Sequence, residues 1–258
     1  MLKGIYEKPV FFLIPCILIL LGNCGLEDYP YIYPVPQSSI TQEMNNRAVV
    51  YIPTTNAGNA AFSNFVIFYR IYVSDIPQAS TTRDTYYAIN PALSTDYSSI
   101  YPYIDSDTLV NTNLDNLFSN RGYKYLQLDG YDIDSVLSGT PGGILGRTII
   151  FDFPASSASE LPTMTIGSSV YTLLRSNGNG IFNPQPADRH FYNTEELWKS
   201  DSINAYTNAD VVNKSSMSDG ARYTYAAMFI AAMGLDDASY TFIYSTPSLI
   251  HVFQLPDR

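Results

Sequence analysis

The nine residues FVIFYRIYV, at positions 65–73, carry the strongest indication of the fold. In a strand they place apolar side chains on both faces: Phe65, Ile67, Tyr69 and Ile71 on one, and Val66, Phe68 and Tyr72 on the other. Successive side chains of a strand point to opposite faces, so this run predicts a central strand that is covered on both sides. The 22 Tyr and 13 Phe residues of the 258-residue chain also favour strands. We therefore predict a mainly β protein.

Further strands are predicted on either side of this run. RAVVYIP, at 47–53, forms a short strand that stops at a proline. Near the C-terminus, ARYTYAAMFIAAM at 221–233 is followed by the turn-like GLDDA and by an apolar segment. This order favours a hairpin, although the alanines alone are compatible with a helix. Pro247 interrupts the second strand and leaves 248–255 as the last one.

These segments resemble parts of a fibronectin type III or immunoglobulin-like sandwich. VVYIP and FVIFYRIY resemble its second and third strands, and the C-terminal block, with its YSTP entry, resembles its last two. The resemblance implies a tyrosine that bonds back to nearby backbone, at Tyr223 or Tyr225. It covers only the two ends of the chain, because the middle is too long for such a module.

The middle, about residues 74–219, is predicted to be a large mixed α/β insertion. Stretches 90–105 and 112–128 have partial helical spacing, whereas 147–154 and 168–176 have the character of strands. The Gly, Asn and Pro content of 176–189 predicts a surface loop. Asn193 and Glu196 form a capping-box pattern, which predicts helical turns at 193–200. With no repeat and no long linker, residues 40–258 are predicted to form a single β-rich domain.

The N-terminal segment has the pattern of an export signal. A start that contains two lysines precedes twelve uncharged residues at 10–21, too few for a membrane-spanning helix. LGNC, at 21–24, resembles the lipobox of bacterial lipoproteins, in a relaxed spirochaete-like form because Asn23 replaces the usual Gly or Ala. The resemblance implies a signal peptide over 1–23, cleavage by signal peptidase II, and a fatty-acylated (palmitate-bearing) Cys24. An ordinary signal peptide or an uncleaved anchor remains open.

Cysteine content agrees with lipidation. Cys16 lies in the leader, so the mature chain has Cys24 as its one cysteine, and acylation explains a lone thiol in an exported protein. The proline-rich stretch up to Ser39 makes residues 24–39 a predicted tether. Gly25, in place of an aspartate after the lipid cysteine, favours the outer membrane. Whether the domain faces the periplasm or the medium is left open.

The charge of the chain bears on its partners. The net charge is −10, from 24 acidic and 14 basic residues. The leader holds one acid and two bases, so removing it leaves 23 acids and 12 bases, a net −11. Because nucleic-acid binding depends on neutralising phosphates with Lys and Arg, we predict no nucleic-acid partner. Direct adhesion to anionic headgroups is disfavoured for the same reason.

No motif assigns a reaction. SGTPGGILGRT, at 138–148, lacks the glycine and lysine of a phosphate loop and is predicted to be a turn that enters a strand. Asp129, Asp132 and Asp134 lack the order of an EF-hand and are predicted to be solvated loop carboxylates. His190 and His251 come without a nucleophile elbow or zinc-ligand spacing. We predict no cofactor, metal or catalytic residue.

The leading functional hypothesis is a membrane-anchored cell-envelope lipoprotein. Its domain is expected to be a non-catalytic binding module for a protein or a glycan, with Trp198 and the tyrosines as a candidate binding face. Two alternatives stay open: an envelope hydrolase whose site assembles only in the fold, and a purely structural envelope component. A pocket with converging carboxylates favours the hydrolase, and an exposed tyrosine-rich patch favours the binding module.

Overall fold

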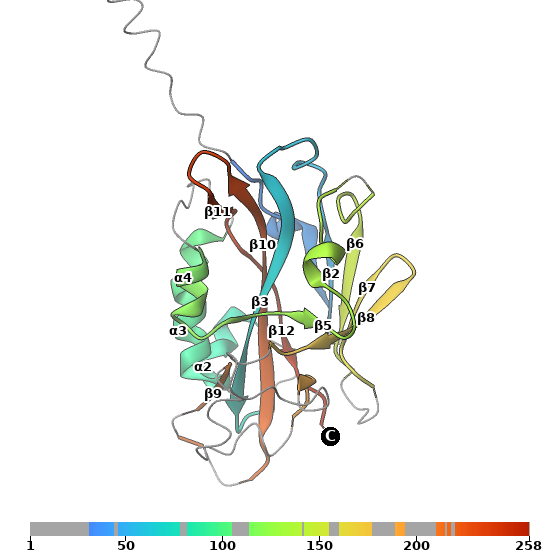
Figure 1. The fold of residues 1–258 in the computed structure, drawn as a ribbon. Helices are drawn as coiled ribbons and strands as arrows, with labels where there is room; N and C mark the ends of the chain where they lie inside the picture. Colours follow the sequence, from blue (N-terminus) through green and yellow to red (C-terminus); the bar gives the residue numbers. More distant parts are fainter. Residues whose placement is uncertain are drawn as a thin grey trace, which may run out of the picture. The chain divides into compact units, whose positions relative to one another are not determined.

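Two long antiparallel strands form the centre of the computed structural model (Figure 1). They are β3, Phe62–Ser74, and β10, Tyr223–Asp236, which pair along almost their whole length. The second edge of β10 pairs with β11, Thr241–Tyr244, and then with β12, Ser248–Gln254. The second edge of β3 pairs with β4, Lys124–Tyr125, and in parallel with β9, Val211–Asn213. We call this the central sheet.

A second antiparallel sheet has the strand order β1-β2-β6-β7-β8-β5. Its strands are β1 (Ile40–Glu43), β2 (Arg47–Tyr51), β5 (Gln127–Leu128), β6 (Thr148–Asp152), β7 (Thr163–Ile166) and β8 (Ser169–Leu174). We call it the outer sheet. β4 lies in the central sheet and β5 in the outer one, so residues 124–128 cross from one sheet to the other.

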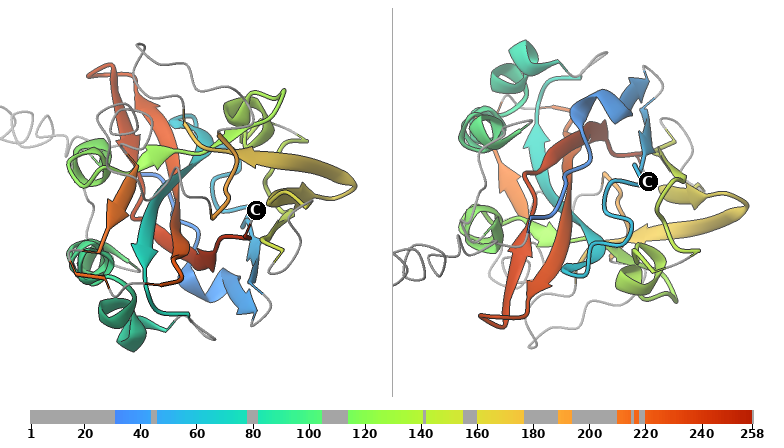
Figure 2. Two further views of the ribbon diagram at one scale, coloured as in Figure 1. Left: turned by 90° about the horizontal axis from the view of Figure 1, so that it is seen from below. Right: turned by 90° about the horizontal axis from the view of Figure 1, so that it is seen from above.

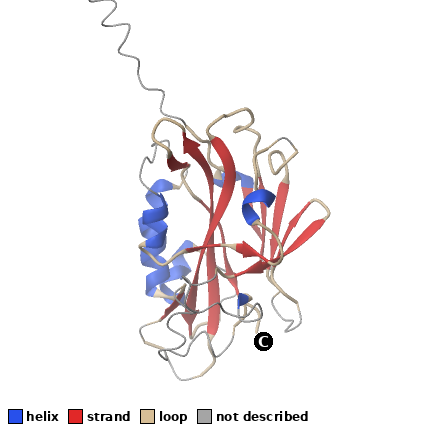
Figure 3. Ribbon diagram, in the orientation of Figure 1, coloured by secondary structure: helices blue, strands red, loops and turns tan. Residues whose placement is uncertain are grey.

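Helices lie on the face of the central sheet that is turned away from the outer sheet (Figures 2 and 3). They are α2 (Tyr86–Ile89), α3 (Pro91–Ile100) and α4 (Leu114–Ser119), with the short 3₁₀ turns η2 (Arg83–Thr85) and η3 (Tyr101–Tyr103). Pro91 stands at the first position of α3, where its missing N–H costs nothing, and Asn90 caps that helix. Two more short elements, η1 (Gln37–Ser39) and α5 (Ile133–Val136), precede β1 and follow β5.

Two hydrophobic clusters separate these layers. Phe65, Ile67, Tyr69 and Ile71 of β3 face the outer sheet and pack in one cluster with residues such as Val50, Ile149 and Phe151. Val66, Phe68 and Tyr72 face the helices and pack with residues such as Leu93, Ile100 and Phe118. Both faces of β3 are therefore buried, and the prediction of a doubly covered central strand is confirmed. The alanines of β10 bring these layers close to its backbone.

The structure describes residues 31–43, 46–77, 82–104, 114–140, 142–154, 160–176, 189–193, 210–214, 216–217 and 220–257. Residues 31–258 form one compact unit. The protein is mainly β with antiparallel sheets, as predicted. Within the described part of the chain, no helix combines the length and apolar character needed to cross a membrane.

Most predicted elements lie where the sequence placed them. The strands at 47–53, 147–154, 168–176 and 248–255 are present, and so are helices within 90–105 and 112–128. The hairpin turn, at 237–240, overlaps only the end of GLDDA at 234–238, because β10 continues to Asp236. The glycine stretch 138–146 is a turn that leads into β6. The loop at 176–189 and the helical turns at 193–200 fall almost wholly outside the described residues.

Three expectations are modified. Residues 31–39 of the predicted tether pack against the domain. Ile32 and Val35 are apolar and are buried in the hydrophobic cluster between the two sheets, which we call the main core. The region 74–219 is mixed α/β, but it is not set apart, since β6–β8 complete the outer sheet. The tyrosine bond to backbone reaches further than expected, since the hydroxyl of Tyr225 donates to the carbonyl oxygen of Ile76, far upstream, at 2.8 Å.

Candidate functional site

The segment that crosses between the sheets forms one wall of a cavity. After β5 the chain turns through Asp129, Gly130 and Tyr131 and enters α5. Gly130 has φ +72°, a left-handed conformation that glycine adopts without strain. A bridge between Leu128 and Tyr131 closes the turn. The pairing of β5 before the turn, the Leu128–Tyr131 bridge and α5 after it thus fix the position of this polar turn.

The cavity has a volume of about 520 Å³, which is within the usual range for small-ligand sites. Its apolar lining comes from β3 and from the crossing segment, with Phe65, Ile67 and Leu126 among the buried residues. Tyr125 and Tyr131 line it as well and remain exposed, Tyr131 by 60% of its surface. The hydroxyl of Tyr125 lies 3.2 Å from that of Tyr244. An apolar floor and aromatic edges thus meet in one place.

Three aspartates also line this cavity: Asp129, Asp132 and Asp134. Asp132 caps α5, because its carboxylate accepts from the hydroxyl of Ser135 at 2.6 Å and from the backbone N–H of Asp134. The hydrogen bond from Ser135 lowers the pKa of Asp132. Partial burial, together with the charge of Asp132, raises the pKa of Asp134, which accepts from Asn64 Nδ2 at 2.9 Å. All three aspartates are exposed, as predicted for solvated carboxylates, and hydrogen bonds also hold the side chains of Asp132 and Asp134 in place.

Arg189 provides the opposite charge. Its Nε donates to the carbonyl oxygen of Arg175 at 3.0 Å, and its Nη2 donates to Gln127 Oε1. Burial lowers the pKa of Arg189, and the negative charge of Asp129 opposes that shift. An arginine always remains charged in a protein, so the cavity lining holds both signs of charge.

A second hollow lies beside the first. It has a volume of about 340 Å³ and shares Tyr131 and Asp132 with the larger cavity. Tyr131 packs edge-on against Tyr171, with ring centroids 5.0 Å apart, and Tyr171 lines the second hollow. Arg147, also in that lining, donates from Nη2 to the Gly142 carbonyl at 2.7 Å. The exposed ring of Tyr131 therefore stands where two hollows meet.

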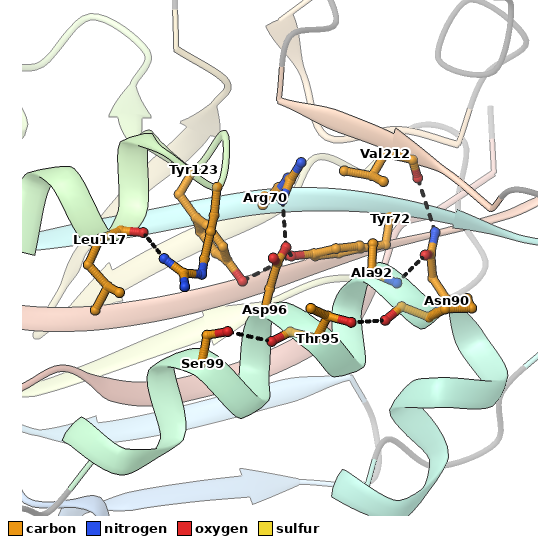
Figure 4. Close-up of polar contacts among 12 residues, drawn as sticks. Arg70, Tyr72, Asn90, Ala92, Thr95, Asp96, Ser99, Leu117, Tyr123 and Val212 are labelled. Carbon is orange, nitrogen blue, oxygen red and sulfur yellow. Dashed lines mark hydrogen bonds and ion pairs between the residues drawn. The ribbon is translucent and has the colours of Figure 1, made fainter.

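A separate polar cluster lies on the helical side of the central sheet (Figure 4). Asp96 of α3 accepts from Arg70 Nη1 at 2.5 Å and from the Tyr72 hydroxyl at 2.6 Å, and the Tyr123 hydroxyl lies 3.0 Å from that of Tyr72. Burial raises the pKa of Tyr72 well above its usual value. Because Asp96, Tyr72 and Tyr123 are buried, we assign this cluster to holding α3 on the sheet.

A third polar cluster lies inside the main core. Arg175 donates from Nε and Nη2 to the two carboxylate oxygens of Asp210, at 2.9 and 2.5 Å, and both side chains are buried. The backbone N–H of Ser176 donates to the Tyr69 hydroxyl at 2.7 Å. A buried charge requires such pairing. This ion pair joins residues that are 35 positions apart.

The remaining sequence candidates do not gather at the cavity. His251 lies in β12 against Phe253, and His190 packs against Tyr192 beside the end of β8. Among the described residues, no group of three or more His, Cys, Asp or Glu is arranged to hold a metal ion. Cys24 and Trp198 lie outside the described residues.

The structure adds residues that the sequence did not single out. Tyr125 and Arg189 line the cavity, and Asn64 donates to Asp134 of its lining. These three residues come from distant segments, and only the folded chain brings them together. In the sequence, the signal for this cavity was the presence of three aspartates within the six residues 129–134. Their neighbours were not visible in the sequence.

Comparisons with protein-family models, curated proteins and solved structures found no match to this chain.

Proposed function

We propose that this chain is a lipid-anchored cell-envelope protein whose β domain binds a glycan without converting it. The observation that carries this proposal is the cavity beside the crossing segment, with its exposed tyrosines and charged lining. Sugars present apolar C–H faces and many hydroxyl groups. Tyrosine rings suit the former, and carboxylates, amides and guanidinium groups suit the latter.

The paired hollows favour a chain of sugars over a compact metabolite. Tyr131 stands between cavities of about 520 and 340 Å³. A protein partner with a flat surface can bind without a recess, whereas a sugar chain gains contacts by entering one. The two hollows therefore support a glycan better than a protein partner. A ligand that spans both hollows lies across the exposed ring of Tyr131.

Binding to oligosaccharides released from the envelope, measured by calorimetry, tests this proposal. Tyr131→Ala is expected to weaken binding about tenfold, which corresponds to a lost contact of about 1.4 kcal/mol. Tyr87→Ala is the matched control, because Tyr87 is 69% exposed on α2 and lines neither hollow. Equal losses in both variants, or no binding by the wild type, contradict the glycan site and favour a structural role.

A hydrolase is the second candidate, and one observation favours it. Asp132 and Asp134 share the cavity, and their pKa values are displaced in opposite directions. Such a difference is typical of paired acid and base carboxyls. Asp134→Asn is then expected to abolish turnover of the same oligosaccharides, measured by reducing-end release. Binding without any turnover by the wild type excludes this candidate.

The proposed anchor rests on the leader and on the lipobox resemblance at 21–24. We propose acylation at Cys24, which lies outside the described residues, and an outer-membrane location. Metabolic labelling with radioactive palmitate tests it. Cys24→Ala is expected to lose the label and Cys16→Ala, the matched control within the leader, to keep it. Equal labelling of the two variants contradicts the anchor.

We also propose that the sandwich is of the fibronectin III or immunoglobulin type. In immunoglobulin constant domains, strands A, B, E and D share one sheet and C, F and G the other. Here β1, β2 and β6 are neighbours in one sheet, and β3, β10 and β12 in the other. The break at Pro247 makes β11 and β12 two halves of one edge strand. β7, β8 and β5 extend the first sheet beyond that plan.

A further inference from the structure

The compact domain begins at Tyr31, seven residues after Cys24, the proposed site of the lipid. Ile32 and Val35 are buried in the core, and Tyr33 exchanges two backbone hydrogen bonds with the side chain of Asn56, at 2.9 and 2.8 Å. Asn59 Nδ2 donates to the Tyr31 carbonyl at 2.7 Å. The chain is thus fixed to the domain at this point. Little of the predicted tether remains to separate the domain from a membrane.

The length of the remaining connection limits that separation. Seven peptide steps join Cys24 to Tyr31, and a fully extended chain spans at most about 3.6 Å per residue, or roughly 25 Å in total. If Cys24 carries lipid, as the proposed function requires, the end of the domain at Tyr31 is held within that distance of the bilayer. This inference therefore rests on the proposed anchor.

The β10–β11 turn lies at the same end of the domain (Figures 1 and 2). Leu235 N–H donates to the Ala61 carbonyl in the β2–β3 loop at 2.9 Å. Added to Gly234, a Cβ atom would lie 2.5 Å from Ile32 Cδ1, so the N-terminal segment and β10 are in close contact here. Residues 31–39, the β2–β3 loop and the β10–β11 hairpin therefore meet at this end of the domain.

This end of the domain exposes large apolar side chains. Tyr240, at the turn, is 82% exposed, and Phe242 is 63% exposed. Phe242 lies directly opposite Leu235 in the strand pair, and Leu235 is exposed as well. Tyr31 and Tyr33 add two exposed rings that pack edge-on at 4.8 Å. We call the three exposed residues of the hairpin, Leu235, Tyr240 and Phe242, the anchor-proximal patch.

The charge of the hairpin narrows the choice of lipid. No Lys or Arg occurs in residues 223–257, whereas Asp236 and Asp237 stand at the turn. Anionic headgroups are therefore repelled, and the exposed aromatic rings suit a neutral interface, where tyrosine is enriched in membrane proteins.

We propose that the anchor-proximal patch rests on the bilayer at the level of zwitterionic headgroups. The lipid on Cys24 keeps the patch at the surface, and Tyr240 and Phe242 enter the interface. The domain then has a fixed orientation on the membrane and does not swing freely on a tether.

Fluorescence quenching in vesicles tests this orientation. The full chain is expressed with lipidation, purified and reconstituted into phosphatidylcholine vesicles that contain lipids spin-labelled near the headgroup. Because acylation consumes the thiol of Cys24, a single new cysteine in Tyr240→Cys accepts a fluorophore selectively. Tyr87→Cys is the matched control, since Tyr87 is also strongly exposed and α2 lies well away from the hairpin turn (Figure 1).

The expected result is quenching several-fold stronger at position 240 than at position 87, and weaker quenching at 240 when phosphatidylglycerol is added. Equal quenching at the two positions, in a chain that floats with the vesicles, overturns the proposed orientation and leaves the anchor intact. A wild-type chain that fails to float, like its Cys24→Ala variant, overturns the anchor and the orientation together. Stronger quenching at 87 than at 240 also overturns the orientation.

Discussion

The side chain of His251 illustrates how burial sets a property of one residue. It is 7% exposed, packs edge-on against Phe253 at 4.9 Å, and has no hydrogen-bond partner at Nδ1 among the described residues. Burial therefore lowers the pKa of His251 to about 4. The uncharged imidazole acts here as a small aromatic core residue.

We predict a loss of stability in mild acid from this residue. An unfolded histidine titrates near pH 6.5 and the folded one near 4, so the unfolded chain binds the extra proton between these values. The free energy of unfolding should therefore fall as the pH drops from 6.5 towards 4, by about 3 kcal/mol from His251. Urea unfolding of the wild type and of His251→Leu at pH 7 and pH 4.5 measures it. Identical pH slopes for the two proteins contradict the prediction.

At the scale of one element, Gly234 determines how β10 passes the β2–β3 loop. An added Cβ would lie 1.9 Å from the Ala61 carbonyl oxygen, which is a backbone atom that cannot easily move. Gly234→Ala is expected to shift or break this contact, with a loss of at least about 2 kcal/mol, typical of overpacking. Urea unfolding measures the change in stability.

The matched control is Gly167→Ala in the β7–β8 turn. Gly167 has φ +61° but open space around its missing side chain, so only conformational strain of about 1 kcal/mol is expected. A smaller loss in Gly234→Ala than in Gly167→Ala means that the loop moves aside freely.

At the scale of the whole molecule, the boundary of the domain lies at Tyr31. A chain that begins at Tyr31 should unfold like the full chain, because the compact unit begins there. A chain that begins at Ile40 loses Ile32 and Val35 from the core, and burial of each contributes about 1.5–3 kcal/mol. Comparison of the two truncated chains by urea unfolding checks this boundary. Equal stability contradicts the packed N-terminal segment.

The sequence by itself determined the mainly β class and the principal strands. In FVIFYRIYV both alternating sets are apolar, and burial of both faces follows directly from the two-residue period of a strand. Pro53 and Pro247 mark strand ends for an equally local reason, because proline has no N–H to donate. The leader and Cys24 also depend only on local pattern, and there the prediction still awaits its test.

The tertiary structure decided which residues meet. The packing of 31–39 on the core, the pairing of β6 beside β2 and the cavity around Asp134, Asn64 and Arg189 all join segments that are distant in the chain. Local pattern fixes which side of a strand is apolar, but not which other strand covers it. That choice depends on the summed burial and hydrogen bonding of the entire domain, and so it appeared only in the folded molecule.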